Sequence, residues 1–108
     1  MNTFDEEMKH YPEYAEGLAE AEKDIAAGKL KLKAYGKLVP WWTTAADLLK
    51  EQYGVEYEVV GWCMTPIEVA ANVAAYNERM EQEIASRFGP KAVYSEWRKA
   101  EKVHGKRR

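Results

Sequence analysis

Two short stretches of the chain alternate strictly between apolar and charged residues. Leucine and alanine alternate with lysine from Lys29 to Ala34, and valine and tyrosine alternate with glutamate from Val55 to Val59. A period of two residues is typical of β-strands with one buried face. We expect the lysine and glutamate rows to share one exposed face of a sheet, where opposite charges on neighbouring strands stabilise the pairing by about 0.2–1 kcal/mol per pair.

Apolar residues at helical spacing predict three shorter helices around these strands. The first covers residues 13–27, and its glutamate-rich edge is expected to be solvated or to serve as a docking surface. The second lies between the strands, where Thr44 and Asp47 form a variant of the capping box and Gly54 ends the helix. The last begins after Pro90. A strand, a helix and a second strand in this order predict a crossover with parallel strands.

The longest predicted helix runs from residue 66 to residue 88. Thr65 is the expected N-cap, Pro66 the first helical residue and Glu68 the capping-box partner of Thr65. Its first half is rich in alanine, so we expect it to lie at the centre of the core or to pack closely against another helix. Its apolar stripe comprises Val69, Val73, Tyr76, Met80, Ile84 and Phe88.

These elements together predict an α+β fold in which helix predominates. We expect a small two-stranded sheet covered on one face by three to four helices, forming a single domain over residues 1–108, with 1–11 and 105–108 as mobile ends. The composition is 46% hydrophobic and 31% charged, which is typical of a globular domain and excludes a disordered chain.

Cysteine content and hydropathy predict a soluble cytoplasmic protein. The single cysteine cannot form an internal disulfide, which favours a reducing compartment. The first residues are acidic and contain no apolar leader, and no apolar run is long enough to span a bilayer, so we expect no membrane contact.

The charge is unevenly distributed along the chain. Residues 97–108 carry six lysines or arginines against one glutamate, a net charge of +5, whereas the whole chain has a net charge of −2. A basic tail of this kind would suit a nucleic-acid accessory protein. No aromatic residue interleaves the final basic run, however, and the acidic remainder of the chain would repel phosphate. Nucleic acid is therefore not the expected partner.

Most kinds of catalytic or metal site are not supported by the residues present. His10 and His104 lie at opposite ends of the chain, and neither has the spacing of a metal site. No glycine-rich phosphate loop is present. The two serines, Ser86 and Ser95, fall within helical patterns and offer no catalytic triad. We therefore expect no metal and no cofactor.

Cys63 has two interpretations. It follows a predicted strand and precedes a helix N-terminus, where unpaired N–H groups lower the pKa of a thiol, so a thiol-dependent enzyme is one alternative. A nucleophile also needs a base, and neither histidine is near Cys63 in the sequence. Lone cysteines are commonly buried, which favours a structural role.

The aromatic residues suggest where a ligand would bind. Trp41 and Trp42 are adjacent, so in an extended segment their side chains diverge and one of them should be exposed, line a pocket or meet another subunit. We expect a cleft with aromatic walls and helix N–H donors at one end, suited to an aromatic or carboxylate-bearing ligand. Its predicted residues are Trp41, Trp42, Trp62, Cys63, Thr65 and Tyr76.

The surfaces left over predict a symmetric homodimer. Two strands leave two unpaired edges, and Trp41, Trp42 and the alanine-rich start of the long helix add apolar surface. Two-fold dimers are the commonest way to cover such surface. The predicted function is a non-enzymatic homodimeric binding module for a small-molecule ligand or a protein partner. The alternatives are an enzyme using Cys63 and a nucleic-acid accessory protein using the basic tail.

Overall fold

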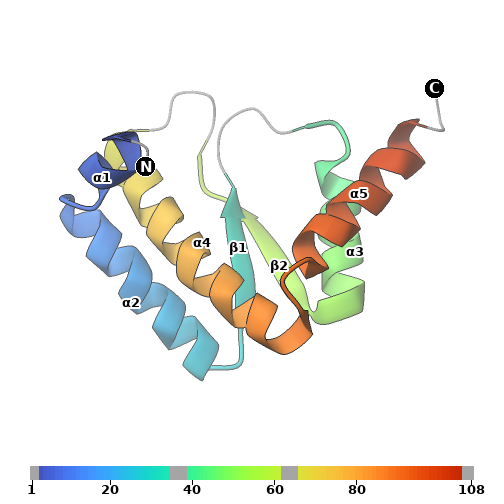
Figure 1. Ribbon diagram of the computed structural model, residues 1–108, viewed down its shortest axis with the longest axis horizontal. Helices are drawn as coiled ribbons and strands as arrows, with labels where there is room; N and C mark the ends of the chain where they lie inside the picture. Colours follow the sequence, from blue (N-terminus) through green and yellow to red (C-terminus); the bar gives the residue numbers. More distant parts are fainter. Residues whose placement is uncertain (1–2, 35–38, 62–65, 106–108) are drawn as a thin grey trace.

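Within residues 3–34, 39–61 and 66–105, which the computed structural model describes, the chain forms five helices and two strands (Figure 1). This arrangement confirms the predicted α+β class in which helix predominates. In chain order the elements are α1 (Thr3–Met8), α2 (Pro12–Ala26), β1 (Leu30–Ala34), α3 (Trp42–Tyr53), β2 (Val55–Val59), α4 (Ile67–Phe88) and α5 (Ala92–Gly105).

The two strands form a parallel sheet, as the strand–helix–strand order predicts. Leu30 lies opposite Val55, and Ala34 lies opposite Val59 at the other end of the pairing. Gly54 has a φ of 70°, in the left-handed region that glycine adopts without strain, and this turn lets β2 follow α3 directly.

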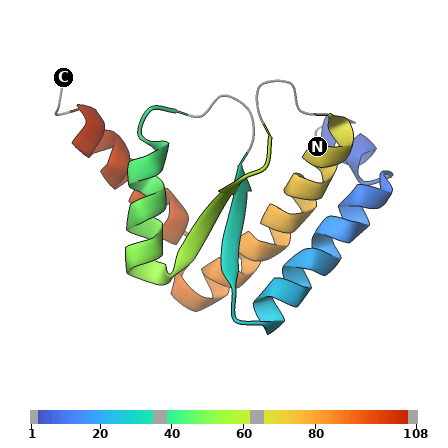
Figure 2. The ribbon, with the colours of Figure 1, turned by 180° about the vertical axis from the view of Figure 1, so that it is seen from behind.

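Helices flank the sheet in two pairs. In Figure 1, α2 and α4 lie on one side of the strands, and α3 and α5 lie on the other. Seen from behind, both strands lie in front of α4 and between α2 and α3, so one face of the sheet is left uncovered (Figure 2). The other face builds the main core, whose buried members include Leu30, Leu32, Leu49, Val55, Met80 and Ile84.

A glycine allows α2 and α4 to pack closely. Gly17 is buried in α2, and a Cβ atom added to it would lie 2.4 Å from the carbonyl oxygen of Asn72 on α4. Two helices approach this closely only where a side chain is missing. Around this contact the small residues Ala70, Ala71 and Ala75 of α4 are buried, which confirms that the first half of the helix packs closely within the core.

One edge of the sheet is closed by a side chain of α4. The amide nitrogen of Asn77 donates to the carbonyl oxygen of Lys33, and the backbone N–H of Lys33 donates to the Asn77 side-chain oxygen, both at 2.8 Å. These two bonds replace the pair that a third strand would make with β1. The outer edge of β1 is therefore satisfied at Lys33 without another strand.

Two predicted helix starts differ from the structure. α3 begins at Trp42, with Trp41 as its N-cap, so the expected cap at Thr44 is wrong. The reason is that the backbone N–H of Trp42 already bonds to the carbonyl oxygen of Val39, so the helical turn begins three residues earlier. α4 begins at Ile67 with Pro66 as its N-cap, one residue later than predicted. Thr65 lies outside the described residues.

The ends of the predicted apolar stripes are less buried than their centres. Phe88, at the end of α4, is 40% exposed, and its ring packs on Tyr53 with 4.8 Å between the centroids. At the other end of the chain, the stretch expected to be mobile contains α1, whose Met8 is buried against Ala70 and Ala71. The N-terminal helix thus covers part of the apolar start of α4.

Candidate functional site

The predicted aromatic cleft falls largely outside the described residues. Trp62, Cys63 and Thr65 belong to the segment that is not described. Trp41 and Trp42 lie half-buried at the start of α3. Tyr76 is fully buried in the main core, and its hydroxyl donates to a carboxylate oxygen of Asp24 at 2.6 Å. Within the described ranges, the two cavities with the clearest chemistry are lined by other residues.

Lys33 does not lie on a solvated face, which corrects one prediction from the alternating pattern. Only 7% of the residue is exposed, because α2 and α4 pack against this part of β1. Its ammonium lies 2.8 Å from Oε1 of Glu20 and 2.9 Å from the side-chain oxygen of Asn72. The same ammonium lies 4.5 Å from the centre of the Tyr76 ring, within range of a cation–π contact.

The acidic edge of α2 is also partly bound within the chain. Besides Glu20, Asp24 accepts the Tyr76 hydroxyl and lies 3.9 Å from the ammonium of Lys31. Burial, and then the hydrogen bond to Asp24, raise the pKa of Tyr76 well above its usual value of 10.0. Tyr76 therefore remains a protonated donor that ties α4 to α2, rather than a group available to a ligand.

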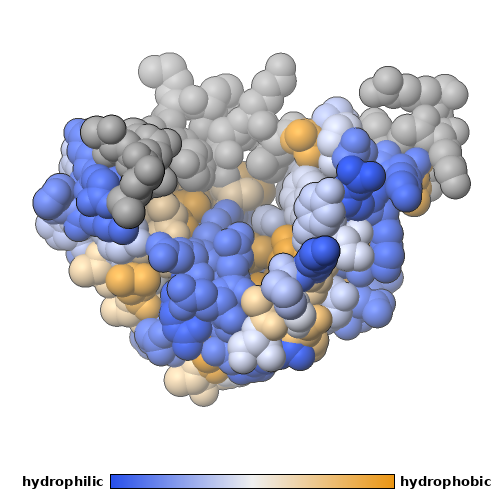
Figure 3. All heavy atoms as spheres, viewed as in Figure 1, coloured by the Kyte–Doolittle hydropathy of each residue, from blue (hydrophilic) through white to orange (hydrophobic). Residues whose placement is uncertain are grey.

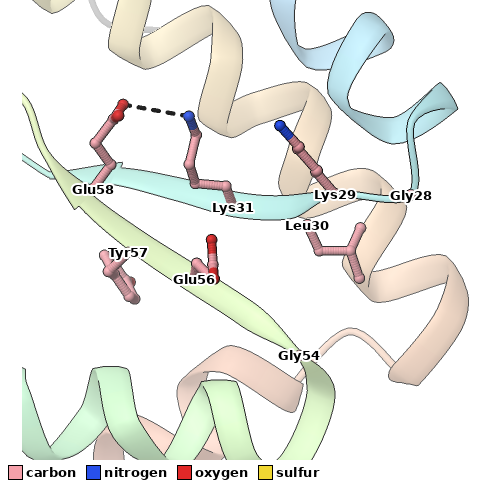
Figure 4. Close-up of a pocket in the computed structure, with 8 residues that line it drawn as sticks. All are labelled: Gly28, Lys29, Leu30, Lys31, Gly54, Glu56, Tyr57 and Glu58. Carbon is pink, nitrogen blue, oxygen red and sulfur yellow. Dashed lines mark ion pairs between the residues drawn. The ribbon is translucent and has the colours of Figure 1, made fainter.

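The uncovered face of the sheet forms a groove of about 540 Å³, here called the sheet groove. Lysines from β1 and the residue before it line one wall, and glutamates from β2 line the other (Figure 4). The glycines that follow α2 and α3 close one end. The lining includes Gly28, Lys29, Lys31, Gly54, Glu56 and Glu58.

Part of the charge in the sheet groove is already paired. Lys31 and Glu58 reach towards one another across the groove, with 3.4 Å between nitrogen and oxygen (Figure 4). Glu56 lies 3.9 Å from Lys50, and both side chains are well exposed, so this pair contributes little. The ammonium of Lys29 has no partner among the residues that the structure describes. The groove therefore presents one unpaired cation and one weakly paired anion.

A second cavity, of about 350 Å³, lies where the end of α4 meets the start of α5. We call it the α4–α5 pocket. Its lining is mainly apolar and aromatic, with one carboxylate, and includes Glu81, Ile84, Pro90, Val93, Tyr94 and Trp97. The indole N–H of Trp97 donates to the hydroxyl of Tyr57 at 3.1 Å, and the two rings meet edge to face, with 5.9 Å between centroids.

Two titratable groups beside this pocket are shifted by their surroundings. Desolvation, and then the negative charge of Glu78, raise the pKa of Glu81 above its usual value. Burial raises the pKa of Tyr57, the hydrogen bond from Trp97 lowers it, and the charge of Glu81 raises it further. The negative charge of Glu81 thus acts on the hydroxyl group of Tyr57.

The sequence pattern anticipates one of these sites and misses the other. The lysine and glutamate rows of the sheet groove are visible in the alternation of β1 and β2. The α4–α5 pocket combines residues from the end of α4 and the start of α5, and its Trp97 bonds to Tyr57 of β2. The lining residues fall between positions 81 and 97, but they belong to two helices and the residues between them, and the periodicity of either helix does not predict a pocket there.

Searches for other kinds of site and for relatives add no further candidate. In the described ranges, no group of three histidine, cysteine, aspartate or glutamate side chains could hold a metal ion. No helix in the same part of the chain is long and apolar enough to cross a membrane. No known protein family, curated protein or solved structure matches this chain.

Proposed function

We propose that this chain is a non-enzymatic binding module that holds an extended polypeptide segment of a partner protein in the sheet groove. The observation that carries the proposal is the pair of charged walls, in which the ammonium of Lys29 has no partner within the described structure and Glu56 has only a distant one. A ligand that carries a negative and a positive group would pair with Lys29 and with Glu56.

The spacing within the groove favours an extended segment. Lys29 and Lys31 are two residues apart on one wall, as are Glu56 and Glu58 on the other. In extended chains, residues two apart point the same way and are separated by about 7 Å. A segment with a charged residue at every second position, alternately acidic and basic, would therefore space its charges as the charged residues of each wall are spaced.

The lining chemistry supports binding rather than catalysis. The groove contains lysines, glutamates, glycines, Leu30 and Tyr57, and no nucleophile paired with a base. The alternative of an enzyme using Cys63 rests on a residue outside the described ones. The alternative of a nucleic-acid accessory protein rests on the basic tail over residues 97–108, of which 106–108 lie outside the described residues. The alternative of an aromatic or carboxylate-bearing ligand beside Trp62 also rests on a residue outside the described ones. These three remain predictions.

The proposed module is a symmetric homodimer in the cytoplasm. One of the reasons for a dimer is weakened, because α1 and α2 cover the apolar start of α4 within the chain. Two reasons remain: the outer edge of β2 and the half-buried pair Trp41 and Trp42. Val59, at the end of β2, is 41% exposed and adds apolar surface beside that edge.

The function is tested by titrating the ¹⁵N-labelled protein with a peptide that carries threonine at every second position. The positions between the threonines are occupied in turn by glutamate and lysine. We expect amide shift changes confined to residues 28–31 and 54–58, with a dissociation constant in the millimolar range, and loss of binding at high salt. The control peptide carries glutamine in place of both charged residues.

Matched variants show whether the groove is responsible. Lys29→Gln and Glu56→Gln should each weaken peptide binding about 1.5-fold to fivefold, as expected for exposed charge pairs. Lys102→Gln changes an exposed lysine of α5, outside the groove lining, and should leave binding unchanged. Equal shifts with the glutamine peptide, or no shifts at all, would exclude this function.

A further inference from the structure

The α4–α5 pocket has one carboxylate, on the exposed residue Glu81, in an otherwise apolar and aromatic lining. Glu81 lines the pocket together with Ile84, Val93 and Trp97, and its side chain makes no hydrogen bond or ion pair with any residue in the described ranges. Glu78, whose charge acts on Glu81, is also negative. A carboxylate in this position is free to attract a cation from solution.

The lining of the pocket also includes two aromatic side chains, Trp97 and Tyr94, and such rings attract cations. Trp97 is held in place by its N–H bond to Tyr57, and the electron-rich face of tryptophan is the best aromatic partner for cations. Tyr94 lies at the mouth, 61% exposed, and the guanidinium of Arg98 lies 5.9 Å from its ring centre. One ring of the pocket thus already has a positive group beside it.

The backbone does not oppose a cation. The carboxyl end of α4 contributes Ala85 to the lining, and the amino end of α5 contributes Val93. The partial charges at these two helix ends have opposite signs and largely offset each other. The nearby side-chain charges therefore decide the preference of the pocket, with Glu81 in the lining and the guanidinium of Arg98 outside it, beside Tyr94.

We propose that the α4–α5 pocket binds a quaternary alkylammonium group. Such a group has no N–H donor, so it does not need the several acceptors that a primary ammonium loses when it leaves water. The pocket supplies one carboxylate, aromatic rings and aliphatic walls, which match a positive charge surrounded by methyl groups. Its volume of about 350 Å³ lies within the usual range for small-molecule sites.

The proposal is independent of the sheet groove and is tested with its own probes. Choline and its neutral isostere 3,3-dimethylbutan-1-ol have the same shape and differ in charge. We expect choline to shift the indole N–H signal of Trp97 and the amide signals around Glu81 and Val93, with a dissociation constant in the millimolar range. The neutral isostere should bind about fivefold to tenfold more weakly.

Two peptides distinguish a free ligand from a protein side chain as the source of the ammonium group. One carries a trimethylated lysine and the other an unmodified lysine in the same sequence. Tighter binding of the trimethylated peptide than of choline assigns the pocket to a modified protein, and the reverse order assigns it to a small molecule. In either case, the proposal requires that the trimethylated peptide binds more tightly than the unmodified one.

Variants separate binding from folding. Glu81→Gln keeps the size of the side chain and should weaken choline binding about fivefold to tenfold, whereas Glu101→Gln, an exposed position on α5 outside the lining, should change it less than about twofold. Trp97→Phe should weaken choline binding while a dispersed amide spectrum shows that the fold persists. Equal binding of choline and its isostere, or no effect of Glu81→Gln, overturns the proposal.

Discussion

Lys33 shows how a single charged side chain holds three elements together. An ammonium removed from water loses a large hydration free energy, which is recovered only if partners surround it. Here Glu20 comes from α2, Asn72 and Tyr76 come from α4, and the lysine itself belongs to β1. The lysine therefore fixes the position of the helix pair on the strand, in addition to any contribution to stability.

Removing this ammonium should destabilise the protein. Lys33→Met keeps most of the aliphatic chain but leaves the side-chain oxygen of Asn72 without its donor, and we expect a loss of about 1–3 kcal/mol in the free energy of unfolding. Urea unfolding followed by circular dichroism measures it. Lys29→Met is the control, because Lys29 is exposed and its substitution should stay within about 0.5 kcal/mol. Equal effects of the two substitutions would contradict this role for Lys33.

At the scale of elements, the contact between α2 and α4 depends on the missing side chain of Gly17. Alanine is the better helix former by about 1 kcal/mol, so propensity alone predicts that Gly17→Ala is stabilising. The added Cβ would lie 2.4 Å from the carbonyl oxygen of Asn72 and 3.1 Å from Cβ of Ala75, which forces the helices apart. We expect Gly17→Ala to destabilise the protein by about 1–3 kcal/mol.

A substitution of alanine by glycine at an exposed position of the same helix measures the effect of helix propensity alone. Ala19 is exposed on the same helix, so Ala19→Gly should cost about 1 kcal/mol through propensity alone. Both variants are compared by thermal and urea unfolding. A gain in stability for Gly17→Ala would show that α2 and α4 can separate without loss.

The stabilisation of α4 by the ion pairs of Glu83 depends on pH. The hydrogen bond from Arg87, together with a further one from Arg79, holds the pKa of Glu83 below its usual 4.5. Because the folded-state pKa is lowered, the stabilisation is present above pH 4.5 and is lost as the pH falls through the folded value. Glu83→Gln should therefore lower stability at neutral pH and have progressively less effect as the solution is acidified. A difference that stays constant down to strongly acidic pH would contradict this.

At the scale of the whole molecule, the open prediction is self-association. Exposed apolar residues are spread over several elements, and the face in Figure 3 shows hydrophobic patches separated by hydrophilic side chains. We expect a dimer joined at the β2 edge or around Trp42. Sedimentation equilibrium over micromolar concentrations should give about twice the monomer mass of 12.4 kDa.

A Val59→Lys variant distinguishes a dimer joined at the β2 edge from one joined around Trp42, because a lysine at the strand edge would oppose only the first. A monomer mass throughout would exclude the dimer.

The sequence predicts the elements well because periodicity is a local property. β1, β2 and α4 are found within a residue or two of their expected ranges. Alternation gives a strand two faces but does not say which neighbour covers each face. The burial of Lys33 depends on Glu20 and Asn72, which are 13 and 39 residues away in the sequence. The bond between Trp97 and Tyr57 spans 40 residues, so no local pattern predicts it.

The amide of Asn77 has a consequence for assembly as well as for folding. A sheet with two free edges can recruit strands on both sides, and such growth has no natural end. In this sheet, the two bonds between Asn77 and Lys33 occupy the β1 side, which leaves β2 as the side where another strand could join. Two copies joined there would place β1 and its Asn77 at both outer margins of a four-stranded sheet. Association through strands would therefore stop at two chains.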